Sequence, residues 1–129
     1  MAEAFFNKLS KKNCATSAGI NKYNFERHVT VANVDANVVE VMAEKGIDVS
    51  RNKIKMASRK MVEDADLVVA IMAKERAKRD LPKYITASPK FRLWGVENTN
   101  YSVKSMHAVQ SEKRDKIFVL VNKLVGEIG

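Results

Sequence analysis

Apolar residues recur along the chain with two spacings, which predict a mixture of helices and strands. Apolar positions three or four residues apart predict amphipathic helices, and short unbroken apolar runs predict buried strands. A glycine at position 46 ends the second helix in the usual C-terminal cap position. The expected helices cover 1–9, 34–45, 57–63, 73–80 and about 104–128, and the expected strands cover 14–18, 67–72 and 91–94.

The clearest strand is Leu67–Met72, six apolar residues in a row that are rich in β-branched side chains. Such a run predicts a central parallel strand that is buried on both faces. Strands that alternate with helices indicate an α/β fold, with a parallel sheet covered by helices on both faces. One segment allows two interpretations. Ile117–Val121 fits the spacing of the C-terminal helix, but it is also an unbroken apolar run that would suit a strand.

Length and composition predict one domain, residues 1–129, inside the cell. The chain is 46% hydrophobic and 29% charged, an ordinary globular mixture. Its apolar runs are all shorter than the roughly 20 residues that cross a bilayer. The first residues carry an acid at Glu3 and no cleavable apolar segment. We therefore expect a cytoplasmic protein without a membrane partner.

Cysteine and histidine usage argues against disulfides, metals and cofactors. Cys14 is the only cysteine, so an intramolecular disulfide and a relay between two thiols within the chain are excluded. His28 and His107 are too far apart in sequence for a zinc motif, and we expect both to be surface or helix-cap residues. No cofactor is expected.

The net charge of +8 makes anionic partners plausible. These would be phosphate compounds, nucleic acid or acidic protein surfaces. The basic residues gather in two runs, 51–60 and 74–83, for which solvated helix surfaces are the ordinary interpretation. Aromatic residues do not interleave with them as single-strand nucleic-acid platforms usually require.

Several segments, in order, resemble one known family. They are Met1–Ala4 (Met-Ala-Glu-Ala), Thr16–Gly19 (Thr-Ser-Ala-Gly), Val39–Ser50 with its Gly-Ile-Asp-x-Ser ending, Asp64–Met72 and Arg114–Ile117. Together they resemble the low-molecular-weight protein tyrosine phosphatases and the related thioredoxin-coupled arsenate reductases. The resemblance runs from Met1 to the end of the chain. It implies the three-layer α/β/α fold of that family, with a small parallel sheet.

The resemblance also implies that the family's catalytic loop is missing from this sequence. Members begin with a central strand and a Cys-x5-Arg-Ser phosphate-binding loop, which leads into a helix that starts Pro-Met-Ala-Glu-Ala. This sequence starts at that methionine, so the first central strand, the nucleophilic cysteine and the anchoring arginine would precede residue 1. Cys14 does not replace that nucleophile, because Ile20 stands six residues after it. In the family pattern Cys14 opens the second strand as a small buried residue.

The general acid and the basic tract of the family are altered too. Asn98 stands where the family has its acidic Asp, and an amide has no proton to give at neutral pH. Glu97 is one position away, on an extended segment that would turn it the other way. The family's basic tract corresponds to Arg51, Lys53 and Lys55. The resolving cysteines of the arsenate reductases are absent, so that activity is the least expected.

Three functions remain open on these grounds. The first is a family member without phosphatase activity that works by binding. The second is a phosphatase whose true start, with the first strand and the phosphate loop, lies upstream. The third is a small basic module that binds phosphate compounds or nucleic acid. Expected partners are phosphate or another small anion, a phosphoprotein, or a second copy through an exposed sheet edge. The anion-binding candidates are Met1, Ala2 and Gly19, at the start of the first helix and in the loop beside it.

A missing first strand would leave a gap between the strands 14–18 and 67–72. Unpaired backbone groups at buried strand edges are costly, so something should fill or close this gap. We expect direct pairing of the two flanking strands, which would give a three-stranded parallel sheet with 91–94 at its other edge. Insertion of 117–121 as a substitute strand, and dimerisation through the exposed edges, are the alternatives.

Overall fold

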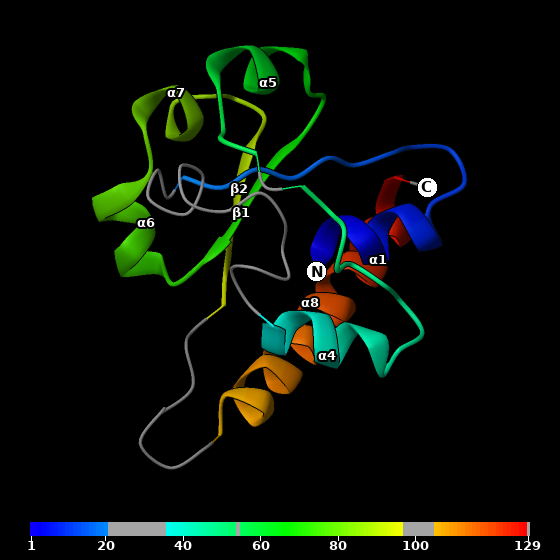
Figure 1. The fold of residues 1–129 in the computed structure, drawn as a ribbon. Coiled ribbons are helices and arrows are strands. Elements are labelled where there is room, and N and C mark those ends of the chain that lie inside the picture. The colour runs from blue at the N-terminus through cyan, green and yellow to red at the C-terminus, as the bar shows by residue number, and fades with distance from the viewer. Residues whose placement is uncertain (21–35, 54, 97–104, 129) are drawn as a thin grey trace.

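Two parallel strands form the sheet in the part of the chain that the computed structural model describes, residues 1–20, 36–53, 55–96 and 105–128. β1 and β2 pair in register from Val68 with Phe91 to Met72 with Gly95. The elements, in chain order, are α1 (Ala2–Leu9), α4 (Ala36–Ala43), α5 (Arg59–Asp64), β1 (Val68–Met72), α6 (Lys74–Asp80), α7 (Lys83–Thr86), β2 (Phe91–Gly95) and α8 (Met106–Ile128) (Figure 1).

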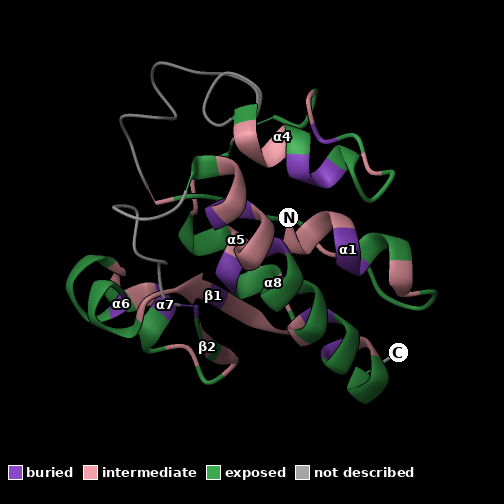
Figure 2. Ribbon diagram, turned by 90° about the horizontal axis from the view of Figure 1, so that it is seen from below, coloured by how far each residue is buried: buried purple, intermediate pink, exposed green. Residues whose placement is uncertain are grey.

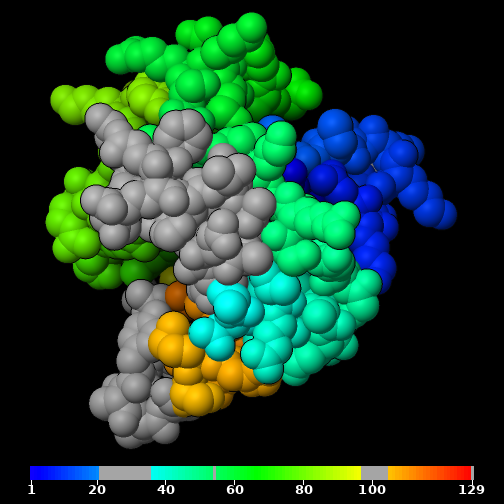
Figure 3. Space-filling view, viewed as in Figure 1, coloured from blue at the N-terminus to red at the C-terminus, as the bar shows by residue number. Residues whose placement is uncertain are grey.

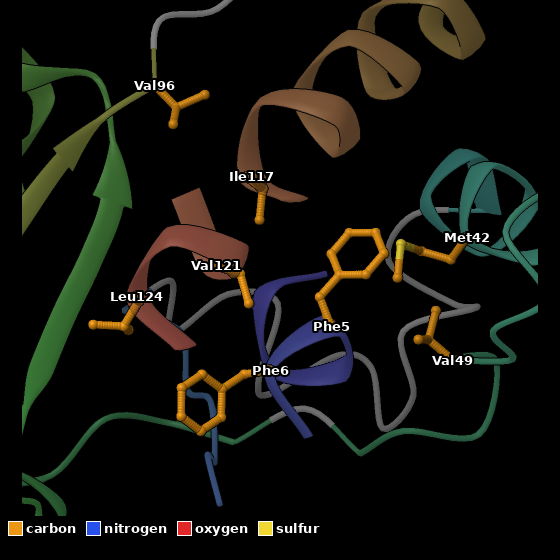
Figure 4. Close-up of a cluster of buried hydrophobic side chains, with 8 residues drawn as sticks. All are labelled: Phe5, Phe6, Met42, Val49, Val96, Ile117, Val121 and Leu124. Atoms are coloured by element: carbon orange, nitrogen blue, oxygen red, sulfur yellow. The ribbon is translucent and has the colours of Figure 1, made fainter. Parts of the chain in front are cut away.

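Helices cover the sheet in two groups, which gives three layers. α5, α6 and α7 lie on one side of the strands, and α1, α4 and α8 lie on the other (Figure 1). The main core is between this second group and the sheet, where the half-buried Leu67, Ile71 and Trp94 of the strand segments pack against it. Its buried members are Phe5, Phe6, Met42, Val49, Val96, Ile117, Val121 and Leu124 (Figure 4).

The expected helices are confirmed, and one short helix was missed. α1, α4, α5, α6 and α8 all lie within two or three residues of the predicted ranges. Gly46 has a φ of 73°, the left-handed conformation that glycine adopts at low cost after a helix. α7 was not expected. It is a four-residue helix with Pro82 at its N-cap, too short to show an apolar period.

The strand alternative for Ile117–Val121 is wrong, because the whole segment lies inside α8. The burial pattern gives the reason. Ile117, Val121 and Leu124 are buried at helical spacing, whereas Val119 is 65% exposed and Phe118 is 41% exposed. A strand between two helix layers would have buried side chains on both faces, whereas the side chains of Phe118 and Val119 are exposed. Figure 2 shows the resulting split of α8 into a buried side and an exposed side.

The predicted strand 14–18 is also wrong, and so is the three-stranded sheet. The segment forms no ladder with β1. It makes one isolated parallel bridge, between Gly19 and Met56. Helix side chains hold it instead, since Asn7 donates to the Ala15 carbonyl at 2.9 Å and accepts the Ala15 N–H at 2.7 Å. Cys14, expected to be buried there, is exposed.

The strand 67–72 is confirmed as β1, but its predicted burial on both faces is wrong. Only Ala70 of β1 is buried, and the residues around it are half-buried. Among the described residues β1 has β2 as its one neighbouring strand, so it is less covered than a central strand would be.

A buried arginine joins α4 to α8. Arg114 is 7% exposed and donates to the Val41 carbonyl at 3.0 Å. The neighbouring carbonyls at the end of α4 accept backbone N–H groups from residues 44–47, so this guanidinium satisfies the remaining one. The Arg114 Nε donates to a carboxylate oxygen of Asp115 at 2.9 Å, and a carboxylate oxygen of Glu44 lies 3.5 Å from the nitrogen that binds Val41.

Replacing Arg114 by Ala should destabilise the fold strongly. The change leaves the Val41 carbonyl without its partner, and hydrogen bonds to charged groups contribute about 1.5–3 kcal/mol. Urea denaturation measures the loss. Arg92→Ala is the matched control, because it removes only an exposed ion pair with Glu127 at 3.3 Å, and such pairs contribute about 0–1 kcal/mol. Equal effects of the two changes would contradict the role given to Arg114.

Candidate binding groove

An open groove of about 1070 Å³ lies between β1 and the segment from Asn13 to Ile20. Phe6, Val121 and Leu124 line it from the α1 and α8 side. Met61, Val62 and Ile85 line it from the side of α5 and α7. The groove therefore occupies the gap that the sequence predicted, and no described strand closes it.

Part of the predicted anion site lies at this groove. Ala2 and Gly19 both line it, and so does Lys55 of the basic tract. Lys55 donates through Nζ to Thr16 at 2.7 Å, and its carbonyl accepts the Gly19 N–H at 2.8 Å. Met1 precedes α1 and is half-buried against the core. Figure 3 shows the N-terminal residues beside the segment that follows α4.

The remaining sequence candidates are elsewhere. Arg51 and Lys53 are exposed and do not line the groove. Asn98 and Glu97, together with the neighbouring Thr99, lie outside the described residues, as does His28. His107 is half-buried in the first turn of α8, with Nε2 3.1 Å from a Glu44 oxygen.

The α-amino group at Met1 is a weaker cation than the sequence suggests. Burial lowers its pKa below the ordinary value, and the nearby Glu3 carboxylate offsets part of that effect. Glu3 also accepts a hydrogen bond from the Ser17 hydroxyl at 2.5 Å. The start of α1 thus offers backbone N–H groups and a partly neutralised amine, beside a carboxylate.

Cys14 lies at the wrong end of α1 for a phosphatase nucleophile. A catalytic thiolate of this type is stabilised by a helix N-terminus and by surrounding N–H groups. Cys14 instead precedes Ala15, which is bonded to Asn7 in the second half of α1. It follows Asn13, which donates to the carbonyl of Ile128 at the end of α8. The only thiol of the chain is therefore beside helix C-termini.

The Gly-Ile-Asp-x-Ser motif has a structural role in this chain. One carboxylate oxygen of Asp48 accepts the Ser50 N–H at 2.9 Å and the Ser50 hydroxyl at 2.6 Å. These bonds lower the pKa of Asp48. The motif closes a local turn of the Asx type, which leads the chain from α4 to the basic tract.

One residue with a clear role was not found from the sequence. Lys90 donates through Nζ to the carbonyls of Val62, Glu63 and Ala65 at the end of α5. A cation at a helix C-terminus stabilises the unpaired carbonyls there. Twenty-five or more residues separate Lys90 from them, so no local pattern indicates the contact.

The described ranges offer neither a metal-binding cluster nor a membrane-spanning helix. No group of three or more His, Cys, Asp or Glu side chains there could hold a metal ion. None of the helices among those residues has the length and apolar character to cross a bilayer.

The fold and the motifs define a class, a small α/β domain with a parallel sheet of the phosphotyrosine phosphatase type. The model of the low molecular weight phosphotyrosine protein phosphatase family matches residues 1–94. The chain belongs to this family. Among curated protein sequences, none matches it significantly.

Solved structures show the same fold. Wzb of Vibrio vulnificus, in complex with benzylphosphonate, superposes with a TM-score of 0.74 at 19% identity, over 98% of this chain and 88% of that one. An arsenate reductase from Archaeoglobus fulgidus has a TM-score of 0.65 at 26% identity, over 97% and 87%. A YwlE mutant from Bacillus subtilis has a TM-score of 0.69 at 20% identity, over 98% and 87%.

The buried α-amino group should make stability depend on pH. Its folded-state pKa is below its unfolded value of about 8. Between these two values the unfolded chain binds more protons, so the free energy of unfolding should rise with pH and level off above about 8. Urea midpoints from pH 6 to 9 measure this. Acetylation of the amino group is the control and should remove the slope, and an unchanged slope would contradict the assignment.

Inorganic phosphate should bind weakly near the start of α1. One helix end without a full ring of amides predicts affinity no better than millimolar, as an order of magnitude. We expect the largest backbone amide shifts at Ala2, Glu3 and Gly19 during a phosphate titration. If the largest shifts fall at residues 51–60, the basic tract is the anion site and this assignment is wrong.

Proposed function

We propose that this polypeptide is a low-molecular-weight phosphatase-like domain that works by binding and does not hydrolyse phosphate esters. The observation that carries the proposal is the position of Cys14. The chain has no other cysteine, and this one lies exposed between the C-terminal ends of α1 and α8. No thiol therefore accompanies the N–H groups at the start of α1.

The other parts of a phosphatase site support the same proposal. The reaction needs an arginine to hold two phosphoryl oxygens and an acid to protonate the leaving oxygen. Of the arginines described, Arg76 lines the groove, but it is paired with Asp80 at 3.4 Å. The sequence has Asn98 at the general-acid position. A small anion such as phosphate, or a phosphoprotein, is the proposed ligand, and the cytoplasm is the proposed location.

A second candidate is an ordinary phosphatase whose start lies upstream of Met1. The open groove favours it, because the gap has the place and the neighbours of a central strand. The relatives favour it too, since about 12% of Wzb has no counterpart here. Asn98 argues against it. An in-frame strand and a Cys-x5-Arg loop in the DNA just before the first codon would establish this candidate.

The third candidate, a nucleic-acid-binding module, is supported only by charge. Arg51 and Lys53 are exposed and available to a polyanion. Phosphate contacts release counterions, so such binding would weaken steeply as salt rises.

The purified polypeptide should not hydrolyse p-nitrophenyl phosphate above background. Nucleophile, oxyanion stabilisation and acid act as one unit, and once the nucleophile is gone the remaining parts contribute little. Asn98→Asp, which restores the acid alone, should therefore recover no activity. The matched control is Cys14→Ser. Turnover that persists through purification and disappears in Cys14→Ser would show that Cys14 is a nucleophile and that the proposal is wrong.

A further inference from the structure

The outer edge of β2 carries backbone groups that no other described segment bonds. β2 pairs with β1 on one side, and the Val68 N–H donates to the carbonyl of the residue before β2 at 3.0 Å. Alternate residues of a parallel strand bond the same neighbour, so Arg92 and Trp94 direct their N–H and C=O groups toward β1. Leu93 and Gly95 therefore direct theirs outward, where the described ranges hold no partner for them.

The side chains of β2 divide between the two helix layers. Arg92 and Trp94 face α8, because Arg92 pairs with an acid in the last turn of α8 at 3.3 Å and Trp94 packs against the main core. The other three residues alternate with them and face the layer of α5, α6 and α7. Of these, Phe91 and Leu93 are half-buried and Gly95 is exposed. The strand is therefore apolar apart from Arg92, whose charge is turned onto α8.

Gly95 meets no packing requirement inside the chain. A Cβ atom at this position would have nothing within 4 Å, and Gly46 is the glycine with a positive φ among the described residues. Glycine weakens a strand, because it loses more backbone freedom and packs no side chain. In a strand it often marks a place where another backbone approaches closely. The exposed glycine thus indicates a neighbour on the outer edge of β2.

A second copy of β2 fits this edge in an antiparallel register. When a two-fold axis passes between the two Leu93 residues, these form a hydrogen-bonded pair, and each Gly95 N–H meets the Phe91 carbonyl of the other copy. The Phe91 N–H already donates to the Ser88 carbonyl at 3.1 Å. Each Phe91 side chain then lies opposite Gly95 of the other copy, where the missing Cβ leaves room for the ring.

The two neighbouring registers are less favourable. An axis at Arg92 would place the two Arg92 residues directly opposite each other, and like charges in that position destabilise a strand pair. The ion pair between Arg92 and Glu127 offsets this only in part, because it is exposed. An axis at Trp94 would leave Phe91 without an opposite residue in β2. With the axis at Leu93, Arg92 lies opposite Trp94 and keeps its ion pair.

We propose that two copies of this chain associate through the outer edges of β2, antiparallel about a two-fold axis at Leu93, so that their sheets join into one. The proposal goes beyond the function proposed above and does not depend on it. Strand addition at a sheet edge is a general mode of recognition. A peptide of another sequence would use the same edge without the match of Phe91 to Gly95. The interface is small, so the dimer should dissociate on dilution.

Hydrogen exchange at several protein concentrations tests the edge in the unmodified chain. Between about 1 µM and about 1 mM, a range in which weak dimers form, sedimentation should show dimers. The amides of Leu93 and Gly95 should become protected over the same range. The amides of Arg92 and Trp94 are the control, because β1 already binds them, and their exchange should not change. A monomer throughout, or dimers without protection at Leu93 and Gly95, would overturn the proposal.

Cysteine cross-linking tests the register, in a Cys14→Ser background. Leu93→Cys places two thiols on a hydrogen-bonded pair, with Cα atoms about 5.5 Å apart and within reach of a disulfide. Gly95→Cys is the matched control, because its two copies lie four residues apart along the strands, about 14 Å. Oxidation should link the Leu93→Cys chains at least tenfold faster. Equal rates, or faster linkage at Gly95→Cys, would contradict the register.

Leu93→Pro tests the backbone bonds themselves. It removes the N–H at the two-fold axis and no bond to β1, and an edge strand tolerates proline when its N–H faces outward. Two intermolecular bonds are lost, so dimerisation should weaken at least about tenfold. Leu93→Val keeps the N–H and should dimerise like the parent. Equal association of the two variants would overturn the proposal. Phosphatase activity does not enter these tests, so the two proposals can fail separately.

Discussion

The packing of α8 against α1 and α4 is the constraint on which the rest of the structure depends. Val109, Ile117, Val121 and Leu124 form one buried stripe along this helix. Complete burial of side chains of this kind stabilises a fold by about 1.5–3 kcal/mol each. Phe5 of α1 packs edge-to-face on Phe118 of α8 with ring centres 5.1 Å apart, and Arg114 ties α4 to the same helix.

That packing also decides where the segment after α1 lies. Once α1 is fixed on α8, Asn7 holds Ala15 and the end of α8 holds Asn13. These contacts use the segment's polar groups on the helix side and hold it across the groove from β1. Among the described residues the sheet therefore has two strands, β1 and β2.

Local patterns predicted the helices, since the stripe of α8 and the cap at Gly46 depend on neighbours in sequence. They also predicted β1 and β2. The prediction of a strand at 14–18 was wrong because a strand forms only beside a hydrogen-bonded neighbour. Asn7 binds the backbone of Ala15 instead, and the spacing of apolar residues in the sequence does not indicate this contact. Lys90 was missed for the same reason, since its three carbonyl partners are far away in sequence. Of the candidate site residues, Ala2, Gly19 and Lys55 line the groove and Arg51 and Lys53 do not, and a binding role for any of them stays a prediction.

The fold of this chain does not depend on the groups that catalysis in this family requires. The core is built from α1, α4 and α8 with the strands, and no atom of it has to take part in catalysis. A phosphatase needs in addition a thiolate at the start of α1, which is where the groove opens and Ala2 lies. The one cysteine of the sequence, Cys14, lies instead beside the C-terminal ends of α1 and α8.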